Sequence, residues 1–426
     1  MISLVIGAGV SGFGAAKLLR ARGKNVRVSD GGILSPDKLA KFSALGIEVL
    51  HGGHRLDHLD GVSEIVISPG VNASHPLLTE AKNRGIQAVS EIDLAMASYN
   101  GTIYAVTGTN GKSTTCAMIH HVLQRLGIKS ALAGNFGMPP SQILAEDGEL
   151  PPHLVLELSS YQLEQTSGLN PTVSIFTSFS HDHMARHGSM FGYLQAKWRI
   201  FDHMKPSGLV LAPSEILMAA NDLGLKLSPS INKIISDRSY ICSLAPSSIV
   251  EPHNRLNAGF AIASVSHSLG LTPESIASKL NDFVGLRHRC ELIGNINGHP
   301  CINDSKSTNV ESTIVALEGQ VTPVLLMMGG QGKGESYEPL LSYKNKIAAV
   351  ITFGASGPDI ARDLSSKIMV HEFPTLAVAL SQIAGIISKV RSPVLFSPGC
   401  ASFDEFDNYE HRGDVFIIGM KSFLDR

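Results

Sequence analysis

Residues 104–115 constrain the fold most, because an apolar run there ends in a glycine-bearing loop that an apolar-periodic segment follows. This order predicts a strand, a phosphate-binding loop and a helix, since backbone N–H groups at a helix N-terminus hold phosphate oxygens. Lys112 is expected to reach the outer phosphates, and the hydroxyl of Ser113 to bind Mg²⁺. Val106 stands where the common pattern has its first glycine. We interpret the loop as a short phosphate loop that binds ATP; the alternative is a tight turn with a solvated lysine.

The composition is typical of a folded, multi-domain chain. At 426 residues two to four domains are expected, and 43% hydrophobic against 17% charged residues argues against disorder. The net charge of −2, without a basic block, disfavours nucleic acid as a partner. The five cysteines form no CxxC pair and indicate free thiols in a reducing cytoplasm. No signal peptide and no apolar stretch of about 18 residues is recognisable, so we expect no membrane insertion.

A second glycine loop, Gly7 to Gly12, lies between a predicted strand and a predicted helix at the N-terminus. It has the GxGxxG spacing, and Asp30 ends the next strand about 20 residues on, as in dinucleotide-binding βαβ units. The glycines report close approach of a diphosphate to the backbone, not which nucleotide binds. A nicotinamide cofactor, another diphosphate ligand and a structural turn all fit this stretch.

A carboxylate ends an apolar strand in the middle of the chain. Glu157 stands at this strand end, where an acid beside a phosphate loop is placed to act on magnesium. The alternative is a buried glutamate satisfied by Ser159 or Ser160. Burial of an unpaired carboxylate costs several kcal/mol, so a metal ion or a cationic partner is expected.

Histidines and a lysine follow in the next elements. His181 and His183 flank Asp182 after a predicted strand, at the end where α/β proteins bind their ligands. Either histidine is therefore a candidate functional residue. Lys197 lies in a predicted helix beside Trp198 and, taken by itself, is interpreted as a surface cation.

Short strands are expected further along, at 209–211, 233–235 and 240–242, before a long helix. Asn254 and Asn257 share one face of that helix, three residues apart. Capping of the helix by Asn254 is the structural alternative to a role in binding.

A third α/β unit opens with a hairpin that Asn297 and Gly298 close as a type I′ turn. Polar loops at 304–309, 329–334 and 397–402 then follow apolar strands, and we expect them to face a ligand. Together with a diphosphate loop and an Mg-ATP loop, these loops indicate ATP-driven ligation or kinase chemistry rather than redox chemistry.

Six motifs occur in a fixed order along the chain. They are residues 107–114 (TGTNGKST), 157–163 (ELSSYQL), 182–184 (DHM), 253–257 (HNRLN), 286–289 (LRHR) and 303–309 (NDSKSTN). In these motifs the chain resembles the Mur ligase family over its full length. The resemblance implies an α/β fold of three domains, each on a mostly parallel sheet. These are a Rossmann-like UDP-binding domain at 1–91, a central P-loop-type Mg-ATP domain at 92–286, and a Rossmann-like domain at 287–426 for the amino acid and part of ATP.

Within the family, the run SPGCASFD at 397–404 resembles the members that add D-glutamate. The resemblance implies an ATP-dependent amide ligase that joins D-glutamate to UDP-N-acetylmuramoyl-L-alanine through an acyl phosphate. Its place would be peptidoglycan precursor synthesis, and hence cell-wall biogenesis, cell shape and division, as a cytoplasmic monomer. A sibling ligase for another amino acid and a folylpolyglutamate synthetase are the alternatives. A nicotinamide-binding oxidoreductase would leave 104–115 unexplained.

The resemblance also assigns ligand contacts, residue by residue. The UDP-sugar would contact Val10, Ser11, Asp30, Gly70 and Asn135. ATP would contact Gly108, Thr109, Asn110, Gly111, Lys112, Ser113, Thr114, Asn254, Asn257, Arg289 and Asp304. D-Glutamate would contact Lys306, Thr308, Lys333, Ser402 and Tyr409.

Two Mg²⁺ sites are implied as well. Ser113 and Glu157 would hold one ion, and His183 with a carbamylated Lys197 the other, so that Lys112, His183 and Lys197 are the implied catalytic residues. CO₂ converts a neutral lysine amine into a carboxylate, which turns a cation into a metal ligand and replaces the surface interpretation of Lys197.

The sequence departs from the family pattern at two places. Gly31 and Gly32 stand where a hydroxyl and a cation are often found after the acid, and Tyr409 stands where phenylalanine is expected. The first departure changes the groups that face the uracil ring, and the second adds a hydroxyl.

Overall fold

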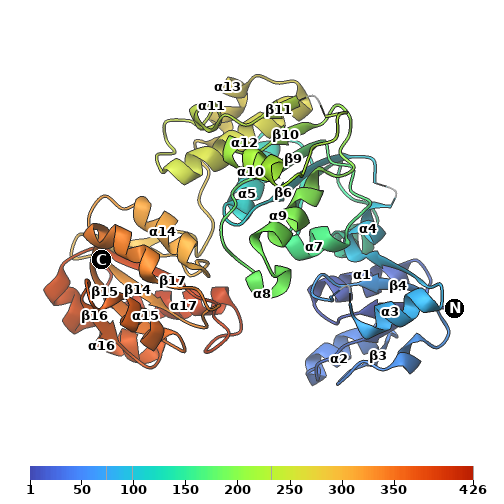
Figure 1. Cartoon of the computed structure of the whole chain (residues 1–426), viewed down its shortest axis with the longest axis horizontal. Coiled ribbons are helices and arrows are strands. Elements are labelled where there is room, and N and C mark those ends of the chain that lie inside the picture. The colour runs from blue at the N-terminus through green and yellow to red at the C-terminus, as the bar shows by residue number, and fades with distance from the viewer. Residues whose placement is uncertain (73, 98, 232, 426) are drawn as a thin grey trace. The chain divides into compact units, whose positions relative to one another are not determined.

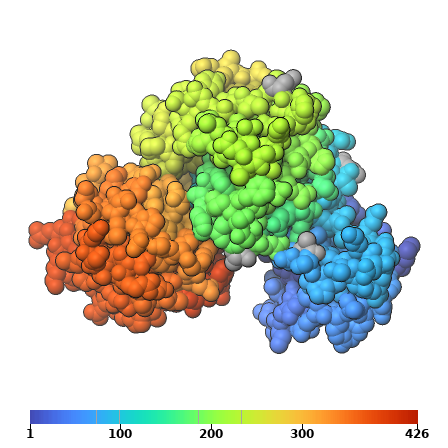
Figure 2. All heavy atoms as spheres, viewed as in Figure 1, coloured from blue at the N-terminus to red at the C-terminus, as the bar shows by residue number. Residues whose placement is uncertain are grey.

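The computed structural model describes residues 1–72, 74–97, 99–231 and 233–425, apart from the side chain of Ala185. Three sheets form in succession along the chain, each covered by helices, and the space-filling view shows each part densely packed (Figures 1 and 2). The contacts divide the chain into two compact units. Unit 1 comprises Met1–Phe179, Met184–Val250 and Asn254–Phe283, and unit 2 comprises Ser180–His183, Glu251–His253 and Val284–Arg426. The three-sheet α/β fold expected from the sequence is confirmed, whereas the domain limits at 91 and 286 stay predictions.

The first sheet is wholly parallel, in the order β3-β2-β1-β4-β5. Its strands are β1 (Ile2–Ile6), β2 (Asn25–Ser29), β3 (Glu48–Leu50), β4 (Val62–Ile67) and β5 (Gln87–Ser90). Its helices are α1 (Val10–Ala21), α2 (Pro36–Ser43), η1 (Leu56–Leu59), α3 (Pro76–Asn83) and α4 (Glu91–Met96). The strand order reverses between β1 and β4, so the carboxyl ends of these strands form the crevice in which such sheets bind ligands.

The second sheet is also parallel, in the order β11-β10-β9-β6-β8-β7. Its strands are β6 (Thr102–Thr107), β7 (Ser130–Gly134), β8 (His153–Glu157), β9 (Val173–Phe176), β10 (Leu209–Leu211) and β11 (Lys233–Ile235). Its helices are α5 (Lys112–Arg125), α6 (Pro140–Asp147), α7 (Ser160–Gln165), α8 (Met184–His187), α9 (Met190–Trp198), η2 (Arg199–Phe201), α10 (Ser214–Asp222), α11 (Arg238–Ser243), α12 (Pro252–Leu269), α13 (Pro273–Ala277) and η3 (Ser278–Leu280). Strand β6 lies inside the sheet, between β8 and β9, and places the phosphate loop there.

The expected strand at 240–242 is wrong, because these residues belong to helix α11. Asp237 caps the helix, and its Oδ1 accepts the backbone N–H groups of Ser239 and Tyr240 at 2.8 and 3.2 Å. An aspartate before a short apolar run starts a helix more readily than a strand, because its carboxylate satisfies the unpaired first-turn donors.

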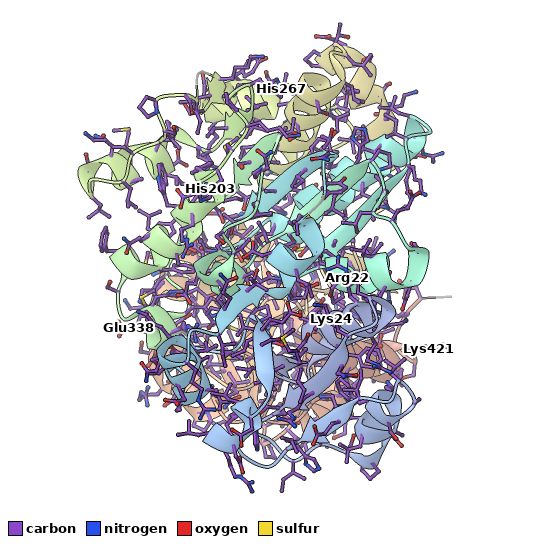
Figure 3. All side chains as sticks on the ribbon, turned by 90° about the vertical axis from the view of Figure 1, so that its right-hand side faces the viewer. Arg22, Lys24, His203, His267, Glu338 and Lys421 are labelled. Atoms are coloured by element: carbon purple, nitrogen blue, oxygen red, sulfur yellow. The ribbon has the colours of Figure 1, made fainter. Side chains whose placement is uncertain are left out.

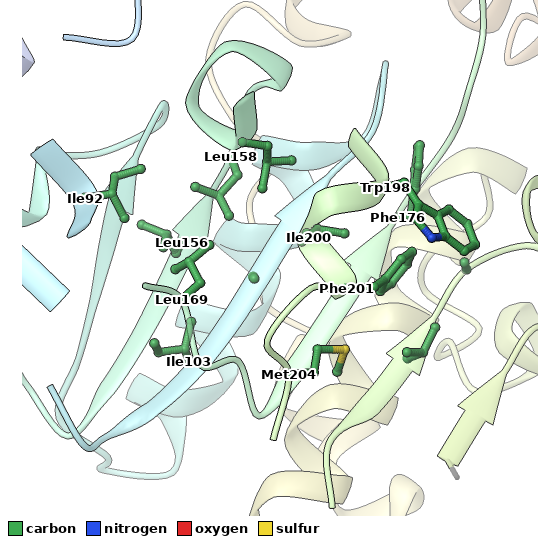
Figure 4. Packing of buried hydrophobic residues seen from close by; sticks show 14 of the residues in the cluster. Ile92, Ile103, Leu156, Leu158, Leu169, Phe176, Trp198, Ile200, Phe201 and Met204 are labelled. Atoms are coloured by element: carbon green, nitrogen blue, oxygen red, sulfur yellow. The ribbon is translucent and has the colours of Figure 1, made fainter. Parts of the chain in front are cut away.

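The core of the second sheet lies on both of its faces. Successive residues of β6 alternate between two clusters: Ile103 and Ala105 join one, and Tyr104 and Val106 the other. Figure 4 shows the first cluster, in which Trp198 packs edge to face on Phe201. Burial on both faces explains why these strands are mostly apolar.

The third sheet, in unit 2, has the order β12-β13-β17-β14-β15-β16. Its strands are β12 (Glu291–Ile296), β13 (His299–Asn303), β14 (Val324–Gly329), β15 (Ile347–Phe353), β16 (Val370–Glu372) and β17 (Val394–Gly399). Its helices are α14 (Val310–Glu318), η4 (Glu338–Lys346), α15 (Gly357–Leu364), α16 (Leu376–Val390) and α17 (Tyr409–Met420). Strands β12 and β13 pair antiparallel. The hairpin turn is confirmed, since Asn297 and Gly298 both have the positive φ, 51° and 77°, of a type I′ turn.

Charged side chains are spread over the surface, among them the exposed Arg22, Lys24 and Glu338 labelled in Figure 3. Among the helices that the structure describes, none has the length and apolar character needed to cross a membrane.

Candidate active site

The loop at 108–111 joins β6 to α5 and requires its two glycines. Gly108 has φ of 146° and Gly111 has φ of 84°, a region that disfavours side chains. A Cβ at Gly108 would lie 2.0 Å from Oγ1 of Thr177. Val106 is buried within β6, which it helps to pair with both neighbouring strands. The missing first glycine therefore reflects a strand that continues one step further before a shorter loop.

The residues after β9 hold the loop from the outside. The N–H of Thr109 donates to the carbonyl of Ser178, and the N–H of Asn110 donates to its Oγ, both at 2.8 Å. Thr177 Oγ1 donates to the carbonyl of Asn110 at 2.6 Å. The loop backbone is thus fixed by its neighbours, which is the preorganisation that a phosphate site needs.

Lys112 begins α5 and turns back over the loop. Its Nζ donates to the carbonyls of Gly108 and Thr109, at 2.9 and 2.8 Å. The first turn of the helix also carries Ser113, which is buried, and Thr114, which is half-buried. The ammonium therefore lies where it can neutralise phosphate oxygens held by the loop.

Glu157 is a buried carboxylate beside the loop and has two polar partners. The hydroxyl of Ser113 donates to Glu157 Oε2 at 2.5 Å, and Asn135 Nδ2 donates to Oε1 at 2.6 Å. Glu157 is 2% exposed. The sequence alternative, satisfaction by Ser159 or Ser160, is wrong, because those hydroxyls bond to Gln162 and His187. A hydroxyl and a carboxylate in contact are hard oxygen donors, which fit Mg²⁺.

Lys197, in α9, lies beside the same loop. Its side chain is 2% exposed, and its Nζ donates to the carbonyl of Gly108 at 2.7 Å. The ammonium also stands 4.8 Å from the ring centroid of Tyr193. The surface interpretation of Lys197 is therefore wrong, since a helix pattern alone does not distinguish an outward lysine from one that reaches a loop carbonyl.

Two asparagines of α12 approach the far side of the loop. Thr115 Oγ1 donates to Asn257 Oδ1 at 3.2 Å, and Asn257 Nδ2 donates to Asn254 Oδ1 at 3.5 Å. A Cβ at Gly111 would lie 2.6 Å from the Asn257 oxygen. Both asparagines therefore share one helix face, as expected, and Asn257 packs against the phosphate loop.

A pocket of about 660 Å³ contains all five residues assigned to the UDP-sugar, Val10, Ser11, Asp30, Gly70 and Asn135. Asp30 orders its floor: Oδ2 accepts the N–H of Ala8 at 2.6 Å and Oδ1 that of Gly32 at 2.8 Å. The sequence analysis missed other lining residues, notably His54, His75 and Gln162. No motif singles out these histidines, which come together only through folding.

His183 lies in unit 2, after the residues that follow β9. Its backbone has φ of 56°, unusual for histidine, and its N–H donates to Asp182 Oδ1 at 2.8 Å. Lys333 Nζ pairs with the same oxygen at 2.7 Å, and Asn309 Nδ2 donates to Oδ2 at 3.3 Å. Burial would raise the pKa of Asp182, but Lys333, His183 and these hydrogen bonds outweigh it and hold this pKa below its usual value. Asp182 therefore acts as the anchor for Lys333.

Asp304, also in unit 2, is buried at the end of β13. Its Oδ2 accepts the hydroxyl of Ser397 at 2.8 Å and its Oδ1 the N–H of Cys290 at 3.1 Å. Burial raises the pKa of Asp304 to about 6, against those hydrogen bonds and the nearby charge of Arg289.

Of the residues assigned to the amino acid, the structure brings Lys306 and Tyr409 together. The Lys306 ammonium lies 4.0 Å from the ring centroid of Tyr409. Thr308 is half-buried in the loop after β13, and Ser402 is buried after β17, where its carbonyl accepts the N–H of Phe406. Lys333, the fifth residue assigned to the amino acid, pairs with Asp182.

Arg412, in α17, is a residue that sequence reasoning missed. It is fully buried and donates to the carbonyls of Gly329, Cys400, Ala401 and Ser305. Burial lowers its pKa to about 10. One side chain therefore fastens the loops that follow β13, β14 and β17.

Comparison with known proteins identifies the family. The model for the MurD-like N-terminal domain of Mur ligases matches residues 2–90, and the model for the Mur ligase middle domain matches residues 106–228. A UDP-N-acetylmuramoylalanine–D-glutamate ligase of Bacillus mycoides is 33% identical over 443 residues, covering 99% of this chain and 97% of that protein. The chain belongs to the Mur ligase family. A ligase of the same name from Shewanella violacea is 33% identical to this Mur ligase, and the match covers 97% of this chain and 94% of that protein.

Solved structures of Mur ligases share the fold. MurF of Thermotoga maritima in complex with ADP superposes with a TM-score of 0.61 at 15% identity, covering 93% of this Mur ligase and 95% of that chain. MurC of the same organism gives a TM-score of 0.59 at 18% identity over 99% of both chains. The MurD-like N-terminal domain model matches residues 2–90, which include the first glycine loop, and the nicotinamide interpretation is set aside on that match.

Proposed function

We propose that this Mur ligase joins D-glutamate to UDP-N-acetylmuramoyl-L-alanine, with conversion of ATP to ADP and phosphate. The observation that carries the proposal is the full-length similarity to relatives that bear this name. The phosphate loop beside Glu157 and the pocket beside Gly7–Gly12 supply the two nucleotide sites that such a reaction needs. The product is a precursor of peptidoglycan, made in the compartment that holds ATP and nucleotide sugars.

The reaction has two chemical steps. The substrate carboxylate attacks the γ-phosphorus of ATP, which forms an acyl phosphate and releases ADP. The neutral amine of D-glutamate then attacks the acyl carbonyl, and the tetrahedral intermediate expels phosphate to leave an amide. Both steps bring anions together, so the main task of the protein is to neutralise and position them.

The residues of this chain divide that task. The first-turn N–H groups of α5 and Lys112 would hold the phosphates, and Lys112 would neutralise charge that builds up on the transferred group. Ser113 and Glu157 would hold one Mg²⁺, whose chemistry is to offset phosphate charge. The asparagine pair of α12 stands behind the loop, where it buttresses the adenosine side of the site.

The second Mg²⁺ site remains a prediction, with His183 and a carbamylated Lys197 as its ligands. Burial of Lys197 beside the Gly108 carbonyl supports a role in this site, because a cation so placed is not a solvated surface group. We expect Lys197→Ala to be inactive and to be partly rescued by short carboxylic acids. Activity without such acids would exclude the carbamate.

The test of the function is phosphate release from ATP with UDP-N-acetylmuramoyl-L-alanine and each of several amino acids. We expect turnover with D-glutamate and none with L-alanine, a diamino acid or a D-alanyl dipeptide. Turnover with L-alanine, or none with D-glutamate, contradicts the proposal and indicates a sibling ligase.

A further inference from the structure

Two histidines line the UDP-sugar pocket next to Gly31. His54 Nε2 lies 3.2 Å from the position that a Cβ at Gly31 would take, and the rings of His54 and His75 meet edge to face with centroids 4.4 Å apart. Both side chains line the pocket. Because Gly31 has no side chain, no side chain covers the Nε2 edge of His54 from this position, and the ring of His75 packs against the ring of His54.

A buried serine restricts the protonation of His54. The hydroxyl of Ser29 lies 2.8 Å from Nδ1 of His54 and 2.8 Å from Nδ1 of His58. A hydroxyl has one proton, so it donates to one ring only, and the other ring must donate to its oxygen. The two histidines therefore carry different tautomers.

The charge of Asp57 favours one of the two tautomer arrangements. His58 Nε2 lies 3.9 Å from Asp57 Oδ1, which favours a proton on this nitrogen. Nδ1 of His58 then accepts the Ser29 hydroxyl, and Nδ1 of His54 donates to the Ser29 oxygen. The Nε2 of neutral His54 is left with an unshared electron pair. Burial lowers the pKa of His54 against the opposing effect of Asp30, so the neutral form prevails near neutral pH.

This edge lies at the nucleoside side of the pocket. Asp30 and Gly31 follow β2, one strand away from the diphosphate loop, where folds of this class hold the nucleoside. Both oxygens of Asp30 already accept backbone N–H groups, from Ala8 and Gly32. Among the described residues no hydrogen bond reaches Nε2 of His54, which leaves this nitrogen as an available acceptor at this side of the pocket.

We propose that His54 selects the nucleobase of the nucleotide sugar by accepting the imide N3–H of uracil at its Nε2. This proposal rests on the proposed function, which supplies a UDP-linked substrate. A cytosine ring in the same position presents an unprotonated N3, so two acceptors would face each other. His54 thus takes over a recognition task at the place where Gly31 and Gly32 offer no side chain.

Binding of free nucleotides measures this contact directly. By titration calorimetry we expect wild-type protein to bind UDP about tenfold or more tightly than 3-methyluridine 5′-diphosphate or CDP, since one buried hydrogen bond is lost or reversed. His54→Phe keeps a flat ring but removes the acceptor, and should weaken UDP binding about tenfold and abolish the discrimination. His54→Gln, which places an amide oxygen near the Nε2 position, should restore part of both.

The exposed His51, which does not line the pocket, gives the matched control, His51→Phe, with unchanged binding. Nitrogen-15 NMR of the imidazoles should report the Nδ1–H tautomer for His54 and the Nε2–H tautomer for His58. His54→Phe that binds UDP like wild type and still rejects the methylated base overturns the role of His54 alone. Wild-type protein that binds no UDP overturns both this role and the proposed function.

Discussion

The two glycine loops of unit 1 both join a strand to a helix, but the charged side chains that contact them have opposite signs. At the end of β1, the acid Asp30 gathers backbone N–H groups, and the first helical residue, Val10, is 71% exposed. At the end of β6, two lysines, Lys112 and Lys197, donate to the same carbonyl of Gly108. Under the proposed function, the first loop would bind a diphosphate that does not react, whereas Lys112 would place positive charge over phosphates that react. Glycine spacing reports backbone approach, and the surrounding charges determine the chemistry.

Removal of the cation from the second loop should have the largest effect. Lys112→Ala is expected to lower kcat by about 10³-fold, roughly 4 kcal/mol of transition-state stabilisation, because nothing else in the first turn of α5 carries positive charge. Phosphate release measures the rate, and circular dichroism checks the fold. The exposed Lys24, changed to alanine, is the control and should keep wild-type activity. Activity of Lys112→Ala within tenfold of wild type would remove the contrast between the loops.

At the first loop, an added side-chain atom at a closely packed glycine should lower the stability of the fold. A Cβ at Gly12 would lie 1.9 Å from the carbonyl oxygen of Gly7, whereas one at Gly9 meets no atom within 4 Å. Urea unfolding should show Gly12→Ala destabilised by about 2–4 kcal/mol and Gly9→Ala by less than about 1 kcal/mol. Equal losses for the two variants would contradict the packing of α1 against this loop.

Replacement of Asp30 beside the first loop should weaken the binding of UDP and leave the binding of ATP unchanged. Asp30→Asn replaces an acceptor of two backbone N–H groups by a group with one acceptor oxygen, at a cost of about 1–2 kcal/mol. We expect UDP affinity to fall about tenfold while ATP affinity stays unchanged, as measured by calorimetry for each nucleotide. A parallel loss of ATP binding would mean that the two loops do not act separately.

The smallest effect concerns the contact between helices α4 and α6, which flank the two sheets of unit 1. Glu91 begins α4, is 1% exposed, and accepts the N–H of Ser141 in α6. Burial raises the pKa of Glu91 from its ordinary value of 4.5 to about 7, so the folded protein binds the proton more tightly than the unfolded chain does. This stabilisation is complete below about pH 4.5 and is lost as pH rises through 7.

Free energies of unfolding at pH 6 and pH 8 test whether Glu91 binds its proton more tightly in the folded protein. Between pH 6 and pH 8 the free energy of unfolding of wild type should fall by about 1 kcal/mol more than that of Glu91→Gln, since glutamine does not titrate. The same pH dependence in both proteins would assign the loss to other groups. The effect on the loops themselves should be small, because neither loop contains Glu91.

The sequence predicts well what local patterns determine. Strand, loop and helix at 104–115 follow from apolar periodicity and glycine placement. The position of Glu157 near the phosphate loop follows from the neighbouring carboxyl ends of β6 and β8, whereas its pairing with Ser113 is implied by the family resemblance. It predicts poorly what depends on long side chains. Lys197 is predicted to be a surface residue, because the sequence pattern of its helix is the same whether the lysine side chain turns outward or inward. Residues 240–242 read as a strand because the capping effect of Asp237 is not weighed against three apolar side chains.

Contacts between distant parts of the sequence leave the weakest signal. His54 and Ser29 meet only because β2 and the segment before η1 come together in the first sheet. Arg412 is one of several charged residues in α17, and nothing in the helix indicates that this one is fully buried. The roles proposed for the ligand-contacting residues stay predictions until the variants above are measured.

Arg412 has a consequence for how such an enzyme can diversify. Within the described part of the chain, its hydrogen bonds go to four main-chain carbonyls and to one serine hydroxyl. Main-chain oxygens are present whatever residue carries them, so the loops after β13, β14 and β17 can exchange side chains without losing their common anchor. A substitution at the tips of these loops therefore leaves the hydrogen bonds of Arg412 to the main chain in place.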